Sequence, residues 1–361
     1  MRRVVIFFPS EWVAYSPTIL NLVEVLRLSI PVRVIAIDNG KYDNTRLDPG
    51  VFHLIKVPDW LFRGTAVVWA YRRLKYWLLT KSITPEVSDI VIGVDNLGVL
   101  CAQAVYNYVH FLSLEIERDR LFQCIDWTRV LSLAIQSEVR LRYLFPKDAP
   151  APVFLLPNAP ILRSPPAAEA ASHGRQLILL GNLTPAHGVF QCIDAVAGME
   201  AATLTLKGPM RVSMRRAIES RYPKLLNDKR LIMDTTYVPQ EDMVEYLKQF
   251  DVGFCFYDFN ILKKGDFNYL SSPSGKLYNY FAAGVPVIGS DIPGLADAVR
   301  FDAGVLLPEL SPVAIREAIS VVLTNRARFR AGCRSAAITM DFGRHAAPYR
   351  SYLLESPVPT C

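Results

Sequence analysis

The sequence predicts an α/β protein with two domains, each built on a parallel sheet that helices cover on both faces. The chain has 361 residues, which is long enough for two domains of ordinary size. Short, continuous apolar runs alternate with helical patterns along both halves, as is typical of parallel strands buried on both faces. Between the halves, residues 164–174 are rich in proline and small residues and are interpreted as a linker.

The composition supports large buried cores and indicates no special partner. Apolar residues make up 51% of the chain and charged residues 20%, with a formal net charge of +6. That charge is too mild to indicate nucleic-acid binding by itself. The cysteines show no CxxC or metal-ligand spacing, which favours reduced, mostly buried thiols over a zinc or redox centre. They are Cys101, Cys124, Cys192, Cys255, Cys333 and Cys361.

The first half contains six apolar runs that predict strands. Their ranges are 3–8, 32–37, 52–57, 89–94, 105–110 and 130–135. Ser16 and Pro17 predict a helix start, with serine as the N-cap and proline at the first helical position. The preceding loop contains Glu11, and it follows the first strand, where open α/β sheets bind ligands. The loop therefore either lines a ligand site or only caps the helix over a buried Trp12. It contains no GxGxxG pattern, so it does not indicate a dinucleotide cofactor.

The second half repeats the alternation of strands and helices. Strands are predicted at 176–180, 203–207, 231–233, 252–256 and 286–288, and helices at 191–196, 214–221, 240–249, 276–283 and 312–323. The tail, residues 342–354, also has helical character.

The most informative stretch runs from Ser272 to Gly294 and predicts a loop, a helix, a glycine stop and a short buried strand. The loop brings small residues, backbone N–H groups and Lys276 to a helix N-terminus, which is a ready site for a phosphate or diphosphate. A lysine there is unfavourable next to the helix dipole unless an anion is bound, and the alternative is a solvated surface lysine.

The core of this stretch, KLYNYFAAGVPV at 276–287, resembles the donor-nucleotide half of glycosyltransferases with the GT-B fold, in particular the retaining family 4 enzymes. Further blocks resemble that family in order and spacing, more loosely in the first half. They are 89–98, 105–115, 135–140, 156–160, 180–188, 237–239 and 251–254. The resemblance implies two Rossmann-like domains facing a deep cleft. Residues 1–160 would bind the acceptor, with the tail 340–361 packing back on them, and residues 161–339 would bind the nucleotide-sugar.

The resemblance also implies a set of site residues. The donor side would comprise Gly181, Asn182, Thr184, His187, Lys207, Tyr237, Ser274, Gly275, Lys276, Leu277 and Asn279, with Tyr257 and Asp258 close by. Gly181 would let its N–H approach a phosphate without a Cβ in the way; the alternative is an ordinary turn glycine. Glu11, Ser16 and His110 would form the acceptor side. His110 and Lys276 would serve catalysis, unless His110 is a satisfied structural residue at a strand end.

Four polar positions depart from the family pattern. Asn182 and His187 stand where many relatives have arginine and lysine in the first phosphate loop. Ser271 and Asn279 stand where they have two glutamates. Fewer fixed cations would then meet the diphosphate, which makes Lys276 and Lys207 the expected substitutes.

We expect a glycosyltransferase that moves a sugar from a nucleotide diphosphate-sugar to a hydroxyl of a glycan or lipid-linked acceptor, with retention. The default expectation for the donor nucleotide is UDP, with GDP as an alternative. A role in lipopolysaccharide or exopolysaccharide biosynthesis would fit. No Asp-X-Asp motif is present, so no metal and no cofactor are expected. The alternatives are a non-catalytic GT-B scaffold subunit and a nucleotide-sugar epimerase or hydrolase of the same fold.

Residues 59–81 combine six aromatic residues with five cations and one acid, a pattern typical of an interfacial membrane helix. The alternative is a core helix with a basic outer stripe. The apolar run at the N-terminus is too short for a signal peptide, and no charge-free run reaches membrane-spanning length. The expected location is therefore the cytoplasm, with contact to the inner face of the membrane left open.

Overall fold

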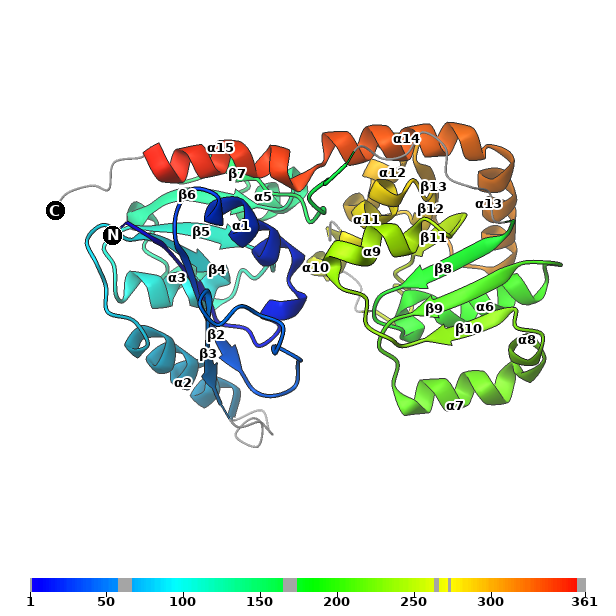
Figure 1. Ribbon diagram of the computed structural model, residues 1–361, viewed down its shortest axis with the longest axis horizontal. Coiled ribbons are helices and arrows are strands. Elements are labelled where there is room, and N and C mark those ends of the chain that lie inside the picture. The colour runs from blue at the N-terminus through cyan, green and yellow to red at the C-terminus, as the bar shows by residue number, and fades with distance from the viewer. Residues whose placement is uncertain (1, 58–66, 165–173, 263–265, 272–273, 356–361) are drawn as a thin grey trace. The chain divides into compact units, whose positions relative to one another are not determined.

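The computed structural model describes residues 2–57, 67–164, 174–262, 266–271 and 274–355 (Figure 1). Contacts divide the chain into two compact units, one of residues 1–158 and 342–361 and one of residues 159–341. Most of the expected linker, the start of the basic segment at 59–66, Ser272 and Cys361 lie outside the described residues.

The first unit is built on a parallel sheet with the strand order β3-β2-β1-β4-β5-β6-β7. The strands are β1 (Val4–Phe8), β2 (Val32–Asp38), β3 (Phe52–Lys56), β4 (Ile90–Val94), β5 (Val109–Ser113), β6 (Val130–Ile135) and β7 (Val153–Leu155). The order changes direction between β1 and β4. The crevice at the carboxyl ends of these two strands is where open α/β sheets bind ligands.

Helices cover both faces of this sheet (Figure 1). They are α1 (Pro17–Arg27), α2 (Val67–Lys81), α3 (Asp95–Gln103), α4 (Arg120–Cys124), α5 (Glu138–Leu144) and α15 (Phe342–Glu355), with single turns η1 (Val13–Tyr15) and η3 (Trp127–Arg129). On one face, α15 packs against α1 and β7. On the other, α3 packs against α2 and across β1, β4 and β5. The helical character expected for the tail is confirmed by α15.

The second unit is built on a parallel sheet with the order β10-β9-β8-β11-β12-β13. Its strands are β8 (Gln176–Leu180), β9 (Thr203–Lys207), β10 (Leu231–Asp234), β11 (Val252–Cys255), β12 (Val287–Ser290) and β13 (Gly304–Leu307). Here the order changes direction between β8 and β11, so the carboxyl ends of these strands form the second candidate ligand position.

The helices of the second unit also lie on both faces. Contacts place α6 and α13 together on one face and α9, α11 and α14 on the other. The full set is η4 (Pro185–His187), α6 (Val189–Ala197), α7 (Val212–Arg221), α8 (Pro223–Asn227), α9 (Gln240–Leu247), α10 (Phe267–Leu270), α11 (Gly275–Ala283), η5 (Pro293–Leu295), α12 (Asp297–Arg300), α13 (Pro312–Thr324) and α14 (Arg326–Thr339).

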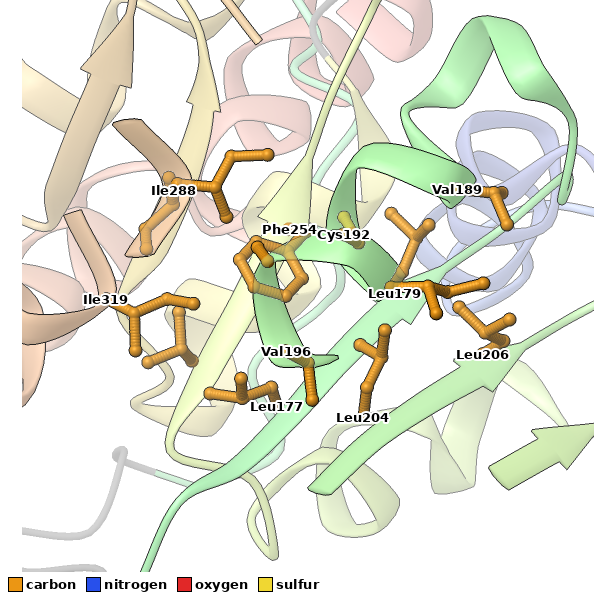
Figure 2. Packing of buried hydrophobic residues seen from close by; sticks show 14 of the residues in the cluster. Leu177, Leu179, Val189, Cys192, Val196, Leu204, Leu206, Phe254, Ile288 and Ile319 are labelled. Carbon is orange, nitrogen blue, oxygen red and sulfur yellow. The ribbon is translucent and has the colours of Figure 1, made fainter. Parts of the chain in front are cut away.

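Strand β8 shows why these apolar runs are continuous. Leu177 and Leu179 enter the core under α6 and α13, where Figure 2 shows them beside Phe254 of β11. Ile178 and Leu180 alternate to the opposite core under α9, α11 and α14. Because successive side chains of a strand point to opposite faces, a strand buried on both faces needs apolar residues at every position.

The predicted α/β class with two parallel sheets is confirmed, and strands 130–135, 176–180 and 203–207 agree at both ends. The strand predicted at 105–110 is wrong, because β5 begins at Val109. Residues 105 and 106 instead close the end of α3, where both backbone N–H groups donate to the carbonyl of Ala102. The Tyr106 hydroxyl then donates to Asp89 at 2.7 Å, which holds the turn in place.

Candidate functional site

The carboxyl ends of β8 and β11 and the first turn of α11 bring together five residues, which we call the Lys276 cluster: Gly181, Thr184, His187, Tyr257 and Lys276. Lys276 Nζ lies 5.2 Å from the centroid of the Tyr257 ring. A Cβ placed on Gly181 would lie 3.8 Å from the same Nζ. The cluster therefore sits where the strand order of the second sheet changes direction, with its cation at the N-terminus of a helix.

His187 ends the single turn η4 and faces the same tyrosine. Its Nδ1 lies 2.7 Å from Thr184 Oγ1, and its ring meets the Tyr257 ring at 5.6 Å between centroids. Burial, together with the positive charge of Lys276, lowers the pKa of His187 to about 4. The imidazole is therefore neutral at pH 7, and it offers hydrogen bonds without a charge.

Asp258 fixes the loop that carries His187. Its backbone N–H donates to the Ala186 carbonyl at 2.8 Å, and its Oδ2 accepts from Gln191 Nε2 at 2.9 Å. The Asp258 side chain is buried, and its carboxylate is satisfied inside the protein by the bonds from Gln191 Nε2 and from the Asn260 N–H. Asp258 thus positions the loop, and its expected place near the nucleotide-sugar stays a prediction.

The N-terminus of α11 supplies the anion-binding character of the cluster. Ser274 is the N-cap residue, without a capping bond from its hydroxyl, and Gly275 and Lys276 form the first turn. Backbone N–H groups of a first helical turn have no partner inside the helix, and the dipole favours a negative charge there. Leu277 serves the core instead of a ligand, since its side chain is fully buried among the apolar residues under α11.

The expected role of the Gly181 N–H is wrong. That N–H donates to the carbonyl of Lys207 at 2.9 Å, which extends the pairing of β8 with β9 by one residue. Gly181 has φ +112, a backbone conformation that residues with a side chain rarely adopt. What Gly181 contributes is the open space next to Lys276.

Lys207 is not the free cation that the sequence analysis expected. Its Nζ lies 2.6 Å from Asp234 Oδ2 and 2.7 Å from Thr236 Oγ1, above the ring of Tyr246. Burial acts to raise the pKa of Asp234, but the hydrogen bonds from Lys207 and Thr236 outweigh it and lower that pKa to about 2. Lys207 and Asp234 therefore form an ion pair that ties β9 to β10.

Asn279 and Ser271 have different surroundings. Asn279 is 7% exposed, and its Oδ1 has no hydrogen-bond partner among the described residues. It lies three residues after Lys276 on α11, a spacing that puts both side chains on one side of the helix. Ser271 is fully buried, and its hydroxyl donates to the Phe267 carbonyl at 2.6 Å. Asn279 Oδ1 is thus a buried acceptor without a partner among the described residues, whereas the Ser271 hydroxyl is satisfied.

Two further donor-side residues lie on loops at the carboxyl edge of the second sheet. Asn182 is exposed and is the second residue after β8. Tyr237 follows β10 and is 47% exposed. Their expected contacts with a nucleotide stay predictions.

His110 does not follow a strand, as the sequence analysis expected, but is the second residue of β5, level with Ile92 in β4. Its ring is buried, with Nδ1 2.8 Å from Ser132 Oγ and Tyr352 against its face at 6.2 Å between centroids. Burial lowers the pKa of His110 to about 3. The geometry is that of an interior histidine, and its expected catalytic role has no support from this position.

Glu11 and Ser16 lie in the loop after β1, at the carboxyl edge of the first sheet. Glu11 Oε1 is 2.6 Å from Lys75 Nζ and accepts a hydrogen bond from Tyr71. Burial acts to raise the pKa of Glu11, but the charge and hydrogen bonds of Lys75 and Tyr71 lower it overall. Ser16 is buried at the start of α1 and makes no capping bond with its hydroxyl. Glu11 thus anchors α2 beside the candidate ligand position.

Asp95 is a residue that the sequence analysis did not single out. It directly follows β4 at the change in strand order and has φ +53, which is strained for a residue other than glycine. Its Oδ1 accepts from the N–H groups of Leu114 and Glu115 at 2.7 and 2.9 Å. Burial raises the pKa of Asp95 to about 7, against the effect of these two bonds. The sequence signal that could have identified Asp95 is a carboxylate directly after a buried strand.

The aromatic, basic segment at 59–81 is described from residue 67 onward, where it forms α2. Lys75 points inward to Glu11, and Arg72 pairs with Asp119 at 3.1 Å. These two cations serve contacts within the unit, which fits a helix packed on the sheet. Trp77 is 56% exposed. Membrane contact stays a prediction.

Other site types have little basis in the described part of the chain. There, no group of three or more His, Cys, Asp or Glu side chains is arranged to hold a metal ion. Among the described helices, none has the length and apolar character needed to cross a membrane.

Comparison with known proteins finds one family model that matches most of the second unit. Residues 174–325 match the family model described as glycosyl transferases group 1. None of the curated protein sequences matches the chain significantly.

Solved structures match over almost the whole chain. Sucrose-phosphate synthase from Thermosynechococcus elongatus has a TM-score of 0.67 at 15% identity, with 99% of this chain and 100% of that chain covered. The E. coli trehalose-6-phosphate structure bound with UDP-2-fluoro glucose has a TM-score of 0.67 at 10% identity, with 99% and 100% covered. A trehalose-6-phosphate synthase studied for glycosyltransfer with retention has a TM-score of 0.68 at 12% identity, with 98% and 99% covered.

At these identities the structures show the fold, which is GT-B: two Rossmann-like α/β units. The fold and the family match together define the class of protein, an enzyme that transfers sugars. The chain has the GT-B fold, and its residues 174–325 match the glycosyl transferases group 1 model.

Proposed function

We propose that the second unit binds a nucleotide diphosphate-sugar, with its diphosphate at the Lys276 cluster. The observation that carries the proposal is the position of Lys276 Nζ, at a helix N-terminus, above Tyr257 and next to the side-chain-free Gly181. First-turn N–H groups and a lysine together suit an anion with two charges. Asn279, with its unpartnered Oδ1 on the same side of α11, is proposed to accept a hydrogen bond from a ribose hydroxyl.

The proposed donor is a UDP-sugar, and the proposed acceptor is a hydroxyl of a glycan or lipid-linked sugar. The E. coli structure with UDP-2-fluoro glucose supports uridine as the base. The work on retention in a trehalose-6-phosphate synthase supports transfer with retention of anomeric configuration. Lys276 and the dipole of α11 would stabilise the negative charge that grows on the departing diphosphate. An acceptor at the inner face of a membrane, in polysaccharide biosynthesis, is part of the proposal.

The acceptor would meet the first unit at the crevice between β1 and β4. The Glu11 loop and Asp95 lie at the carboxyl ends of these strands. Asp95 combines a strained backbone with a carboxyl group whose pKa is raised to about 7 by burial, a combination typical of functional positions.

The proposal is tested by release of UDP from UDP-glucose, UDP-galactose and UDP-N-acetylglucosamine in water, which can replace an acceptor. We expect one donor to be hydrolysed, with the α-sugar appearing first in the proton NMR spectrum. Lys276→Ala should lose this activity, and Lys224→Ala, which removes an exposed lysine from α8, should keep it. Release of the β-sugar would contradict retention. Equal activity in wild type and Lys276→Ala would contradict the site.

A further inference from the structure

We propose that His187 takes up a proton from solution when a nucleotide diphosphate-sugar binds the Lys276 cluster, and that the resulting imidazolium is the second cation of the site. The inference rests on the proposed function, which places the diphosphate there.

The geometry assigns different tasks to the two nitrogens of His187. Nδ1 lies 2.7 Å from Thr184 Oγ1, so Thr184 holds the ring through this nitrogen. The Tyr257 ring packs against the imidazole at 5.6 Å and also lies below Lys276 Nζ. His187 and Lys276 thus both lie against one aromatic ring. With Nδ1 held by Thr184, Nε2 of His187 would be the nitrogen that meets a ligand.

The charged and titratable groups around His187 explain why it is neutral without a ligand. Lys276 approaches from α11, Tyr257 from the end of β11, and Asp258 from the following loop. Burial and then Lys276 lower the pKa of His187 to about 4. Asp258 is not among the causes of this shift, and its carboxylate accepts hydrogen bonds from Gln191 and from the Asn260 N–H.

A bound diphosphate would raise the pKa of His187 and favour its protonated form. An opposite charge within about 4–6 Å typically shifts a pKa by 1–3 units toward the charged form. In the bound state Nδ1–H donates to Thr184 Oγ1 and Nε2–H donates to a diphosphate oxygen. The added proton comes from water, and no bond of the donor breaks. The site therefore gains its second positive charge, on His187, only when the ligand binds. A lysine at this position would carry the charge permanently.

The sign of the pH dependence follows from proton linkage. Between the pKa of the free protein and that of the complex, the complex holds more protons. Affinity therefore falls as the pH rises through this window. With a starting pKa of about 4, a rise of about two units predicts roughly tenfold weaker binding at pH 8 than at pH 5.

The experiment is a calorimetric titration of the full chain with UDP-glucose at pH 5, 6, 7 and 8. Each titration is run in two buffers that differ in ionisation enthalpy, so that proton uptake is measured directly. In UDP-glucose the diphosphate is esterified at both ends, so it lacks the ionisation near pH 6 of a terminal phosphate. We expect uptake close to one proton at pH 5, falling toward zero at pH 8.

Two variants isolate His187. His187→Gln keeps a polar side chain that does not titrate, and its affinity should be flat across pH, at the wild-type level for pH 8. His187→Lys carries a permanent charge and should bind about tenfold more tightly than wild type at pH 8, without proton uptake. His53→Gln, which changes an exposed histidine of β3, is the matched control and should keep the wild-type profile.

UDP-glucose binding without proton uptake, or an unchanged pH profile in His187→Gln, overturns the proton uptake while leaving the donor site intact. Absence of binding at every pH overturns the proposed UDP-sugar site and this inference with it.

Discussion

Lys276 Nζ lies 5.2 Å from the centroid of the Tyr257 ring and so joins the start of α11 to the end of β11. The two elements are separated in sequence, and their meeting point is where the strand order of the second sheet changes direction. A lysine at a helix N-terminus opposes the helix dipole. A tyrosine face compensates part of that cost through the cation–π attraction. The remaining cost is what a bound diphosphate would remove.

Lys276→Ala is expected to weaken binding of UDP by about 10–100-fold, the usual range for one charge-assisted hydrogen bond of 1.5–3 kcal/mol. The free energy of unfolding should stay within about 0.5 kcal/mol of wild type, because the change removes a partly exposed side chain. Calorimetry and urea unfolding check the two parts. Lys224→Ala controls for the loss of one positive charge, and equal UDP affinity in both variants would remove Lys276 from the site.

Lys207→Met is expected to affect stability rather than donor binding. It leaves the Asp234 carboxylate without its ion-pair partner, and we expect a loss of about 2 kcal/mol in the free energy of unfolding. UDP affinity should change less than twofold at a temperature where both proteins are folded. The reverse pattern, full stability with much weaker UDP binding, would restore Lys207 as a diphosphate ligand.

Asn279→Leu tests the unpartnered Oδ1. Wild type should bind 2′,3′-dideoxyuridine diphosphate about fivefold more weakly than UDP, the effect of one hydrogen bond of about 1 kcal/mol. Asn279→Leu should bind both nucleotides equally. The effect of changing Asn279 and the effect of removing the ribose hydroxyls are then not additive. Because leucine leaves no buried carbonyl unpaired, stability should be kept or raised. A variant that still prefers UDP by the wild-type factor would show that Asn279 does not contact the ribose.

His110 is expected to make the stability of the protein depend on pH. Its pKa is lowered from 6.5 to about 3 in the folded protein, so below pH 6.5 the unfolded chain binds a proton that the folded chain does not. Stability is complete above pH 6.5 and falls by at most about 1.4 kcal/mol per pH unit as the pH drops toward 3. Urea unfolding at pH 7, 6, 5 and 4 measures this slope. His110→Phe should reduce this slope by up to about 1.4 kcal/mol per pH unit. An unchanged slope would show that the His110 ring titrates with an ordinary pKa.

Asp95→Asn should cost much less stability than Asp95→Val. Asparagine adopts positive φ more readily than other side chains and keeps an acceptor for the loop N–H groups, whereas a β-branched residue is strained there. Asp95→Val should therefore lose at least about 2 kcal/mol more stability than Asp95→Asn. Thermal and urea unfolding compare them. Similar stability of the two variants would argue against a strained backbone at this position.

Local sequence patterns predicted most of the fold. The runs at 176–180 and 203–207 are apolar or β-branched except at Gln176 and Lys207, and each is followed directly by a glycine, so both ends of each strand could be predicted. The helix at 326–339 was missed, because an arginine- and alanine-rich segment shows little hydrophobic periodicity. The error at 105–110 arose because the apolar residues of a closing helical turn look like those of a strand.

The site was less predictable, because its chemistry depends on contacts between distant residues. Lys276 was singled out from its place at a helix start, which is a local signal. The pairing of Lys207 with Asp234 spans 27 residues, and only the fold shows that this lysine is occupied. The same holds for the Gly181 N–H, which is used by the neighbouring strand.

The measurement that tests the central claim most directly is a calorimetric titration of the intact chain with UDP, GDP, ADP and CDP. The account predicts one preferred nucleotide, UDP, bound with a Kd in the micromolar range or below, about −8 kcal/mol. That binding should be about 10–100-fold weaker in Lys276→Ala and unchanged in Lys224→Ala. A flat response to all four nucleotides would contradict a donor site at the Lys276 cluster.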